Sequence, residues 1–555
     1  MTKPEFGHIV IVGSLSPELS PKIALNGSND MKTRLWTALL TSAALAASLS
    51  LAAAEMVYNR GANGDPQSLD PHKTATVEEA NIIRDLFSGL VVHDAKADLM
   101  PGAAESWTIS EDGKVYTFKL RKDGAWSDGT PVTAKDFVFS FRRVVDPATA
   151  SEYAYIIEPI VNAKEITAGT AKPETMGVKA IDDLTLEITL KSSTPYFLEL
   201  LTHQAAYGIS EANVAKFGAD WVKPGNMVSN GAFTLAEFTP NDKVKIVKNP
   251  KFYDAASVKL DVVNYLTAED RSAAMKRFEA GELDSNNDFP TEQLAELKTK
   301  LGDQVRLSPL LGTYYYVFKT KKAPWSNPKL RHAISKAIDR DYLAEKVWQN
   351  AMIPAYSMVP PGVAGYTTST TDYAVAAQLD REDEAKKLFT ELGISPEKPL
   401  KMELRFNTSD NHKNTAVAIQ DMLKPFGFEV SLINADGKTH YSFLEQKGDF
   451  DVARVGWNAD YKDPATFLEL GKSGAGNNYG EYSNKEYDDL LAAAASEADP
   501  AKRMALLSQA EAILMRDLPV MPLLYYSNHN IVSPKIKGFE ENVMDIHPSR
   551  FISKE

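Results

Sequence analysis

A chain of 555 residues is too long to pack around one hydrophobic core. Single cores stop growing at about 250 to 300 residues, and longer chains divide into domains. Hydrophobic residues make up 44% of the chain and charged residues 24%. This composition is typical of globular proteins and excludes a disordered or collagen-like chain. We therefore expect two or three folded domains.

The net charge and the absence of cysteine exclude several classes of function. Lys and Arg number 61 and Asp and Glu 74, so the formal net charge is −13. Such a chain repels a phosphate backbone, and we expect no nucleic-acid partner. Without cysteine there is no disulfide framework, thiolate nucleophile, iron–sulfur cluster or Cys-ligated zinc, and no cysteine to carry a lipid anchor.

Residues 31–54 have the layout of a secretory signal peptide. Lys32 and Arg34 precede an uncharged, largely apolar stretch, and the small residues Ala52 to Ala54 fit a cleavage site. A short transmembrane anchor is the alternative, because the stretch is long enough to span a bilayer. Its many Ala, Ser and Thr residues favour the signal peptide. We expect cleavage after Ala54 and export from the cytoplasm.

Residues 1–30 precede this signal, although a signal peptide normally begins at the initiator methionine. We interpret them as a non-native upstream extension that results from a misassigned start codon. Residues 55–555 contain no hydrophobic run of spanning length. The mature protein is therefore predicted to be free in solution outside the inner membrane.

Strand and helix patterns are interleaved along the rest of the chain. Residues 116–120 and 184–190 alternate apolar and polar side chains, which predicts strands with one buried face. Asn327-Pro328 and Asp499-Pro500 each supply a cap and a first-turn proline before apolar residues at helical spacing. The mixture predicts α/β or α+β domains with mixed sheets. The apolar face of the first predicted helix comprises Leu330, Ile334, Ile338 and Tyr342.

The sequence offers no support for an enzyme. The Gly-Lys-Ser/Thr sequences at 471–473 and 437–439 lack the earlier glycine that a phosphate-binding loop requires. There is no His-Glu-x-x-His or Gly-x-Ser-x-Gly motif, and the nine histidines show no metal-ligand spacing. The carboxylate pairs at 182–183 and 488–489 are interpreted as solvated surface charge. We expect no catalytic residue, no metal and no cofactor.

Several ordered sequence blocks carry a family resemblance. AESW at 104–107 is followed by the strand pattern VYTFKLR at 115–121 and by WSDGTPVTAKDF at 126–137. These blocks resemble the peptide and nickel family, family 5, of bacterial extracytoplasmic solute-binding proteins, and within it they are most similar to the oligopeptide binders. Further matching blocks are SLDPH at 68–72, GVKAIDD at 177–183, PGN at 224–226, TYYY at 313–316, NTSD at 407–410 and FDVAR at 450–454.

The resemblance implies an α/β fold of the type II periplasmic-binding-protein class in its large three-domain form. Two lobes with mixed sheets would close over the ligand through a hinge of two segments. Domain I would comprise residues 55–88, 213–311 and 528–555, domain II would be inserted at 89–212, and domain III would span 312–527.

The same resemblance implies a monomeric periplasmic receptor that binds short linear peptides largely independently of their side chains. It would deliver them to an ABC importer, a permease and ATPase complex in the inner membrane. Such a site must hold what all peptides share, which is the backbone and the two charged ends. A murein-peptide or dipeptide receptor on the same fold is one alternative, and a secreted hydrolase is an alternative from another class.

The resemblance also implies roles for individual residues. Asp460 matches the aspartate that pairs with the peptide α-ammonium, because a buried ammonium needs a counter-charge. Arg454 and His412 match positions that meet the α-carboxylate, for which a guanidinium supplies a fork of donors. A surface or capping Asp, a structural Arg paired with a protein carboxylate, and an exposed loop His are the alternatives. Residues implied to contact the peptide backbone or to line the pocket are Tyr153, Val77, Trp457, Asn458 and Gly456.

Overall fold

The structure is a computed structural model that describes residues 55–555 except Ala75 and Glu269. The predicted upstream extension and signal peptide lie outside the described residues. Residues Glu55–Glu555 form one compact unit.

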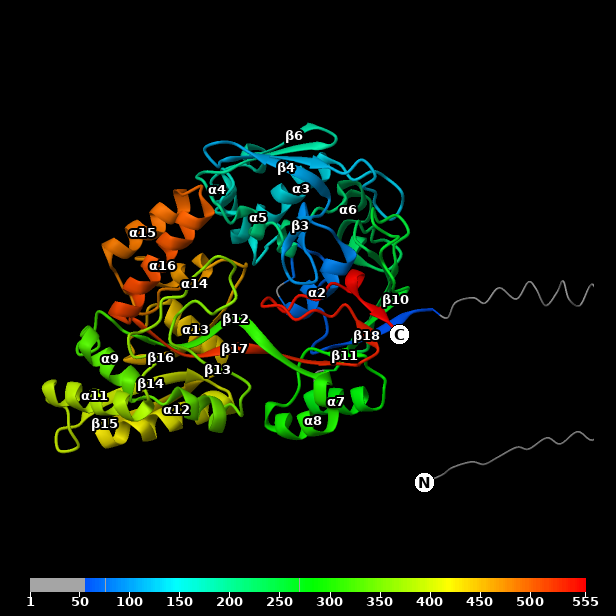
Figure 1. The fold of residues 1–555 in the computed structure, drawn as a ribbon. Coiled ribbons are helices and arrows are strands. Elements are labelled where there is room, and N and C mark those ends of the chain that lie inside the picture. Colours follow the sequence, from blue (N-terminus) through cyan, green and yellow to red (C-terminus); the bar gives the residue numbers. More distant parts are fainter. Residues whose placement is uncertain (1–54, 75, 269) are drawn as a thin grey trace, which may run out of the picture. The chain divides into compact units, whose positions relative to one another are not determined.

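One mixed sheet of eleven strands runs through this unit (Figure 1). Parallel and antiparallel pairs occur side by side in it, as the sequence patterns predict. Its strands are, from one edge to the other, β15 (Phe428–Ala435), β14 (Leu400–Asn407), β16 (Val452–Asn458), β12 (Val305–Phe318), β17 (Val520–Val532), β11 (Ser285–Asn286), β1 (Val57–Ala62), β10 (Val262–Thr267), β9 (Lys243–Lys248) and β8 (Phe233–Thr239), with β13 (Ile353–Pro354) beside β17.

A second sheet of four antiparallel strands contains both strands expected from alternating patterns. Its order is β4 (Ala104–Ile109), β5 (Val115–Leu120), β7 (Thr185–Thr189) and β6 (Val178–Asp182). Tyr116, Phe118, Leu186 and Ile188 are buried, so the alternation identifies the buried face correctly. Two short pairs join β2 (Val91–His93) to β3 (Leu99–Pro101) and β18 (Ile536–Lys537) to β19 (Ser553–Lys554).

Helices cover these sheets. They are α2 (Val77–Leu86), α3 (Ala134–Val145), α4 (Ala163–Thr167), α5 (Phe197–Leu200), α6 (Glu211–Phe217), α7 (Arg271–Glu279), α8 (Leu294–Leu301), α9 (Pro328–Ala337), α10 (Arg340–Tyr342), α11 (Gln378–Glu391), α12 (Asp410–Leu423), α13 (Gly437–Glu445), α14 (Ala465–Leu468), α15 (Lys485–Ser496) and α16 (Pro500–Asp517).

The capping signals locate two helix starts correctly. The Asn327 side chain accepts a hydrogen bond from the Lys329 backbone at the start of α9, and Asp499 does the same for Lys502 at the start of α16. The expected apolar face of α9 is wrong at Tyr342. The helix ends at Ala337 and Asp339 caps the separate helix α10, so Tyr342 is exposed.

β12 and β17 are the two longest strands, and they pair antiparallel through the middle of the large sheet (Figure 1). One half of this pair adjoins β11 and the other half adjoins β16. The register shifts between Pro309 and Thr313. The domain boundaries implied at 311/312 and 527/528 fall on these two strands, close to this irregularity. The boundaries themselves remain a prediction.

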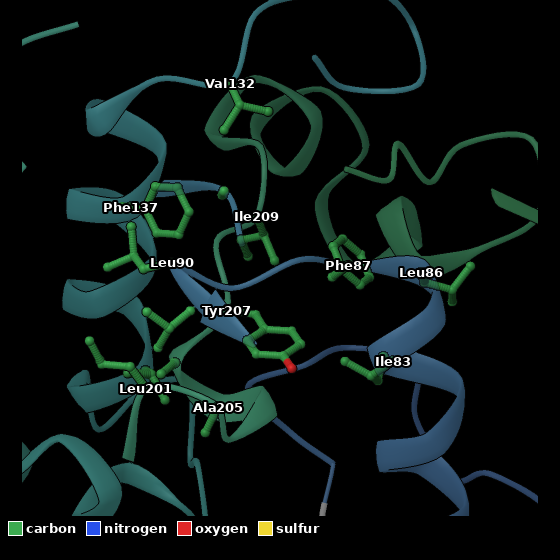
Figure 2. Packing of buried hydrophobic residues seen from close by; sticks show 14 of the residues in the cluster. Ile83, Leu86, Phe87, Leu90, Val132, Phe137, Leu201, Ala205, Tyr207 and Ile209 are labelled. Carbon is green, nitrogen blue, oxygen red and sulfur yellow. The ribbon is translucent and has the colours of Figure 1, made fainter. Parts of the chain in front are cut away.

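Separate hydrophobic clusters pack on the two ends of this strand pair. Figure 2 shows part of one cluster, in which Phe87, Phe137 and Tyr207 gather around α2 and α3. Two other clusters pack against β12, one containing Tyr314 and Tyr316 and the other containing Tyr315 and Val317. Successive side chains of β12 point to opposite faces of the sheet, so the strand contributes buried residues to a hydrophobic cluster on each face.

Candidate ligand-binding cleft

A cleft of about 620 Å³ lies between two segments that are far apart in sequence, residues 155–200 and 457–477. Trp457 and Asp460, both singled out in the sequence, belong to its wall. The remaining lining residues are Tyr155, Ile156, Glu158, Pro159, Lys191, Tyr196, Leu200, Tyr461, Thr466, Glu469, Leu470, Ala475, Gly476 and Asn477. The glycine-rich segment 471–478 therefore contributes to the cleft through Ala475, Gly476 and Asn477.

Asp460 lies just beyond the end of β16 and is half-buried in this cleft. Burial, followed by the charge of Glu469, raises the pKa of Asp460 to about 6, and a hydrogen bond from the Tyr155 hydroxyl partly opposes the shift. No Lys, Arg or His of residues 55–555, as far as the structure describes them, forms an ion pair with Asp460. The carboxylate is thus positioned to receive a cation from the cleft.

Tyr153 is not among the residues that line the cleft, but it lies close to Asp460. Its ring is 5.6 Å from that of Tyr155 and stacks on His203 at 4.5 Å between centroids. Burial and the charge of Asp460 raise the pKa of Tyr153. Tyr153, Tyr155 and Asp460 therefore form one neighbourhood.

Contacts across the cleft hold the segment after Asp460. Tyr461 stacks on Tyr196 with centroids 4.9 Å apart and planes 4° from parallel. The Lys462 ammonium donates to Asp98 at 2.8 Å and to the Ala97 carbonyl at 3.2 Å. The Tyr461–Tyr196 stack joins the wall that carries Asp460 to the opposite wall, and Lys462 ties the same segment to residues 97–98, which do not line the cleft.

Arg454 and His412 lie together, but neither lines the cleft around Asp460. Arg454 is buried in β16, where its guanidinium donates to the Asn407 side chain at 3.0 Å, the Tyr441 hydroxyl at 3.2 Å and the Tyr526 hydroxyl at 2.6 Å. No carboxylate within the described part of the chain pairs with it. The structure therefore removes the alternative of a structural Arg454 neutralised by a protein acid.

Arg454 keeps its positive charge although it is buried. Burial lowers the pKa of Arg454, whereas the neighbouring tyrosines, Tyr526 and Tyr314 first among them, raise it, and the net change is upward. The guanidinium also lies 4.6 Å from the centre of the Tyr314 ring. Its buried Nε has no hydrogen-bond partner among the described residues. Arg454 is therefore a buried cation, and its Nε–H group is a donor without a partner among the described residues.

His412 is on α12, with its ring 5.5 Å from that of Tyr314. Burial lowers the pKa of His412 to about 3, and the charges of Arg454 and His440 contribute. Its buried Nδ1 is without a hydrogen-bond partner in the part of the chain that the structure describes. A neutral histidine beside an unneutralised guanidinium can donate to an anion.

The strand between Arg454 and Asp460 has an uncovered edge. β12 pairs with β16 from Val452 to Asn458, whereas β14 pairs only with Val452 and Ala453 on the other side. The His440 ring donates to the Arg454 carbonyl at 2.9 Å on this second side. Because backbone groups alternate along a strand, the N–H and C=O groups of Gly456 and Asn458 point toward the uncovered edge. An extended peptide can pair there.

Close packing explains the glycine in this strand. A Cβ at Gly456 would lie 2.4 Å from the Tyr526 hydroxyl and 2.9 Å from Nη2 of Arg454. Trp457 is half-buried, and its indole donates to Thr466 at 3.0 Å, which fixes it in the cleft wall. Asn458 is exposed.

Val77 is not brought to this cleft. It begins α2, is 62% exposed and lines a separate pocket of about 180 Å³ with Arg60, Asn81 and Tyr265.

Among the described residues, no group of three or more His, Asp or Glu side chains could hold a metal ion. No helix in the described part of the chain has the length and hydrophobicity needed to cross a membrane.

Sequence reasoning missed Tyr155, Tyr196 and Glu469. Tyr155 could have been found from its position two residues after Tyr153. Tyr196 and Glu469 carry no local signal, because an aromatic residue or a glutamate in a short helix is ordinary in any protein.

Comparison with known proteins gives consistent results. The family described as bacterial extracellular solute-binding proteins, family 5 Middle, matches residues 98–479. The periplasmic oligopeptide-binding protein OppA of Escherichia coli is 41% identical over 488 residues, covering 87% of this chain and 89% of OppA. The periplasmic murein peptide-binding protein MppA of Escherichia coli is 40% identical over 481 residues, covering 86% and 89%.

Solved structures share the whole fold. The unliganded open form of MppA has a TM-score of 0.83 at 38% identity, covering 90% of this chain and 98% of that one. The complex of Haemophilus influenzae OppA with the peptide RPPGFSPFR has a TM-score of 0.73 at 36% identity, covering 90% and 99%. The α/β fold with mixed sheets is thereby confirmed.

Proposed function

The chain belongs to family 5 of the bacterial extracellular solute-binding proteins, and we propose that it is a periplasmic receptor for short linear peptides. The family consists of binding proteins, so the chain is a receptor and not an enzyme. The proposal concerns its ligand, its location and its delivery of that ligand to an ABC-type importer in the inner membrane.

The proposal rests on the order of charged and backbone groups along β16 and the residues that follow it. The unneutralised cation Arg454 comes first, the uncovered edge at Gly456 and Asn458 follows, and the unpaired carboxylate Asp460 comes last. These are the groups that a peptide's carboxylate, backbone and ammonium require. In an extended strand the two charged residues are at most about 20 Å apart, which limits a peptide running between them to about six residues.

The arrangement also explains how side chains could be tolerated. A peptide paired with the strand edge would satisfy its backbone groups with main chain and direct its side chains alternately to the two faces. Tight binding then depends on charges and backbone, and side chains contribute less.

Mass spectrometry of the small molecules released when the purified protein is denatured tests the proposal. The proposal predicts a mixture of peptides with free amino and carboxyl ends, about two to six residues long. If the released material were instead a single murein tripeptide, the result would indicate that the chain binds the same kind of ligand as MppA. Release of non-peptide solutes, together with no binding of added peptides, would overturn the proposal.

A further inference from the structure

Glu469 is a second carboxylate in the cleft that contains Asp460. It begins the 3-10 helix η9 (Glu469–Gly471) directly after α14, and its side chain is exposed to the cleft. The Glu469 carboxylate accepts a hydrogen bond from the Tyr196 hydroxyl at 3.3 Å. The charge of Glu469 contributes to the raised pKa of Asp460, so the two groups lie near each other.

The other charges that line the cleft already have partners. Glu158 lies 3.8 Å from the Lys164 ammonium, and Lys191 lies 3.0 Å from Glu165. Lys472 is exposed on the same turn as Glu469. Its charge lowers the pKa of Glu469 against the larger opposite effect of burial, but the two side chains form no ion pair and Lys472 does not line the cleft. Within the described residues, neither Asp460 nor Glu469 has an ion-pair partner. The unneutralised charges that line this cleft are therefore both negative.

The aromatic walls of the cleft independently favour a cation. Tyr155, Tyr196, Tyr461 and Trp457 line it together. The environment of Tyr196 already accommodates a cation, since the Arg503 guanidinium lies 5.3 Å from its ring centre. Aromatic faces attract ammonium and guanidinium groups, most strongly where water is excluded.

A peptide ammonium neutralises only one of the two carboxylates. If the cleft closes on a peptide, the second carboxylate loses water, and an unpaired charge in a dry site is unfavourable. A second cation on the ligand removes this cost. The first residue is the natural source, because its side chain starts from the carbon that bears the ammonium held by Asp460.

We infer that Glu469 forms a second cation subsite, which takes the side-chain ammonium or guanidinium of a basic first residue. The inference rests on the proposed function, since it needs the peptide amine at Asp460. The chain should therefore prefer peptides that begin with lysine or arginine.

Calorimetry with Lys-Ala-Ala and norleucine-Ala-Ala tests this inference, because the two differ in the terminal ammonium and have similar aliphatic chains. The wild-type protein should bind the lysine peptide at least about fivefold more tightly, as expected for a charge pair that loses water on binding. In Glu469→Gln, which keeps an acceptor for the Tyr196 hydroxyl, the ratio should fall to near one. The preference should also shrink as salt is raised.

Two controls define the result. Ala-Ala-Lys should show no dependence on Glu469. The exposed Glu486→Gln on α15 removes the same charge at a residue that does not line the cleft, and it should keep the lysine preference. A wild-type ratio near one, or an unchanged ratio in Glu469→Gln, would overturn the inference while tripeptide binding upheld the proposed function. Failure of every tripeptide to bind would contradict the proposed function itself.

Discussion

Arg454 and Asp460 lie six positions apart on β16 and its continuation, and neither forms an ion pair within the part of the chain that the structure describes. Buried or half-buried charges without partners are costly in a binding protein unless a ligand neutralises them. Their opposite signs and the open strand edge between them match the two ends and the backbone of a peptide.

Peptide affinity should decrease as the pH falls below about 6. The pKa of Asp460 is raised to about 6 by burial and by the charge of Glu469, and only the ionised carboxylate attracts an ammonium. The peptide amine loses its own proton near pH 8. Calorimetry between pH 5 and 9 should give the highest affinity between these values, with net proton release on binding at pH 6. A flat profile from pH 5 to 7 would contradict the assigned role of Asp460.

Replacing Arg454 by lysine should weaken the binding of peptides to an extent that depends on peptide length. Lysine keeps the charge but not the fork of donors that reaches Asn407, Tyr441 and Tyr526. Peptides whose carboxylate reaches this site should lose about tenfold or more in affinity, the loss expected for one charged hydrogen bond. Titrating two- to six-residue peptides measures this, with the exposed Arg516→Lys as control. Equal losses at every length would argue against a carboxylate site.

Alanine at position 456 should destabilise the folded protein by about 1 to 3 kcal/mol, the usual cost of overpacking. The new Cβ would lie 2.4 Å from the Tyr526 hydroxyl. Tyr526→Phe removes this oxygen, so the double variant should recover part of the loss in urea unfolding. Gly437→Ala is the matched control, because no atom lies within 4 Å of its added Cβ. Additive effects of the two substitutions would show that the hydroxyl is not the obstacle.

Glu511 should make the folded protein less stable as the pH rises from about 4.5 to 7. It is fully buried on α16, accepts hydrogen bonds from the Val359 and Ser369 backbones, and burial raises its pKa from 4.5 to about 7. The folded state holds a proton that the unfolded state releases over this range, and the loss amounts to about 3 kcal/mol.

Urea unfolding at pH 5 and pH 8 measures this contribution. In Glu511→Gln the part of the pH dependence that comes from this carboxyl should disappear, whereas the exposed Glu486→Gln should keep it. An identical pH dependence in the wild type and in Glu511→Gln would exclude a protonated Glu511.

Sequence patterns predicted local structure where local chemistry decides it. Alternation located β5 and β7, and the Asn-Pro and Asp-Pro caps located α9 and α16, because each signal acts within a few residues. The exposure of Tyr342 was not predicted, since helical spacing continues past Ala337 although the backbone restarts at Asp339.

The site was only partly predictable, because its parts come from distant segments. Family resemblance pointed to Asp460, Arg454 and His412, and the structure shows what surrounds them. It could not point to Glu469, whose significance depends on a cleft formed with residues some 270 positions away. The open edge of β16 depends on where β14 stops pairing, and no local sequence pattern encodes that.

The most direct test of the peptide-receptor account compares tri-alanine with N-acetyl-tri-alanine by calorimetry, in the wild type and in Asp460→Asn. The account predicts that acetylation weakens binding to the wild type at least about tenfold, since it removes the charge that Asp460 would neutralise. In Asp460→Asn the two ligands should bind with similar, low affinity. Equal affinity of the wild type for both ligands would contradict the account.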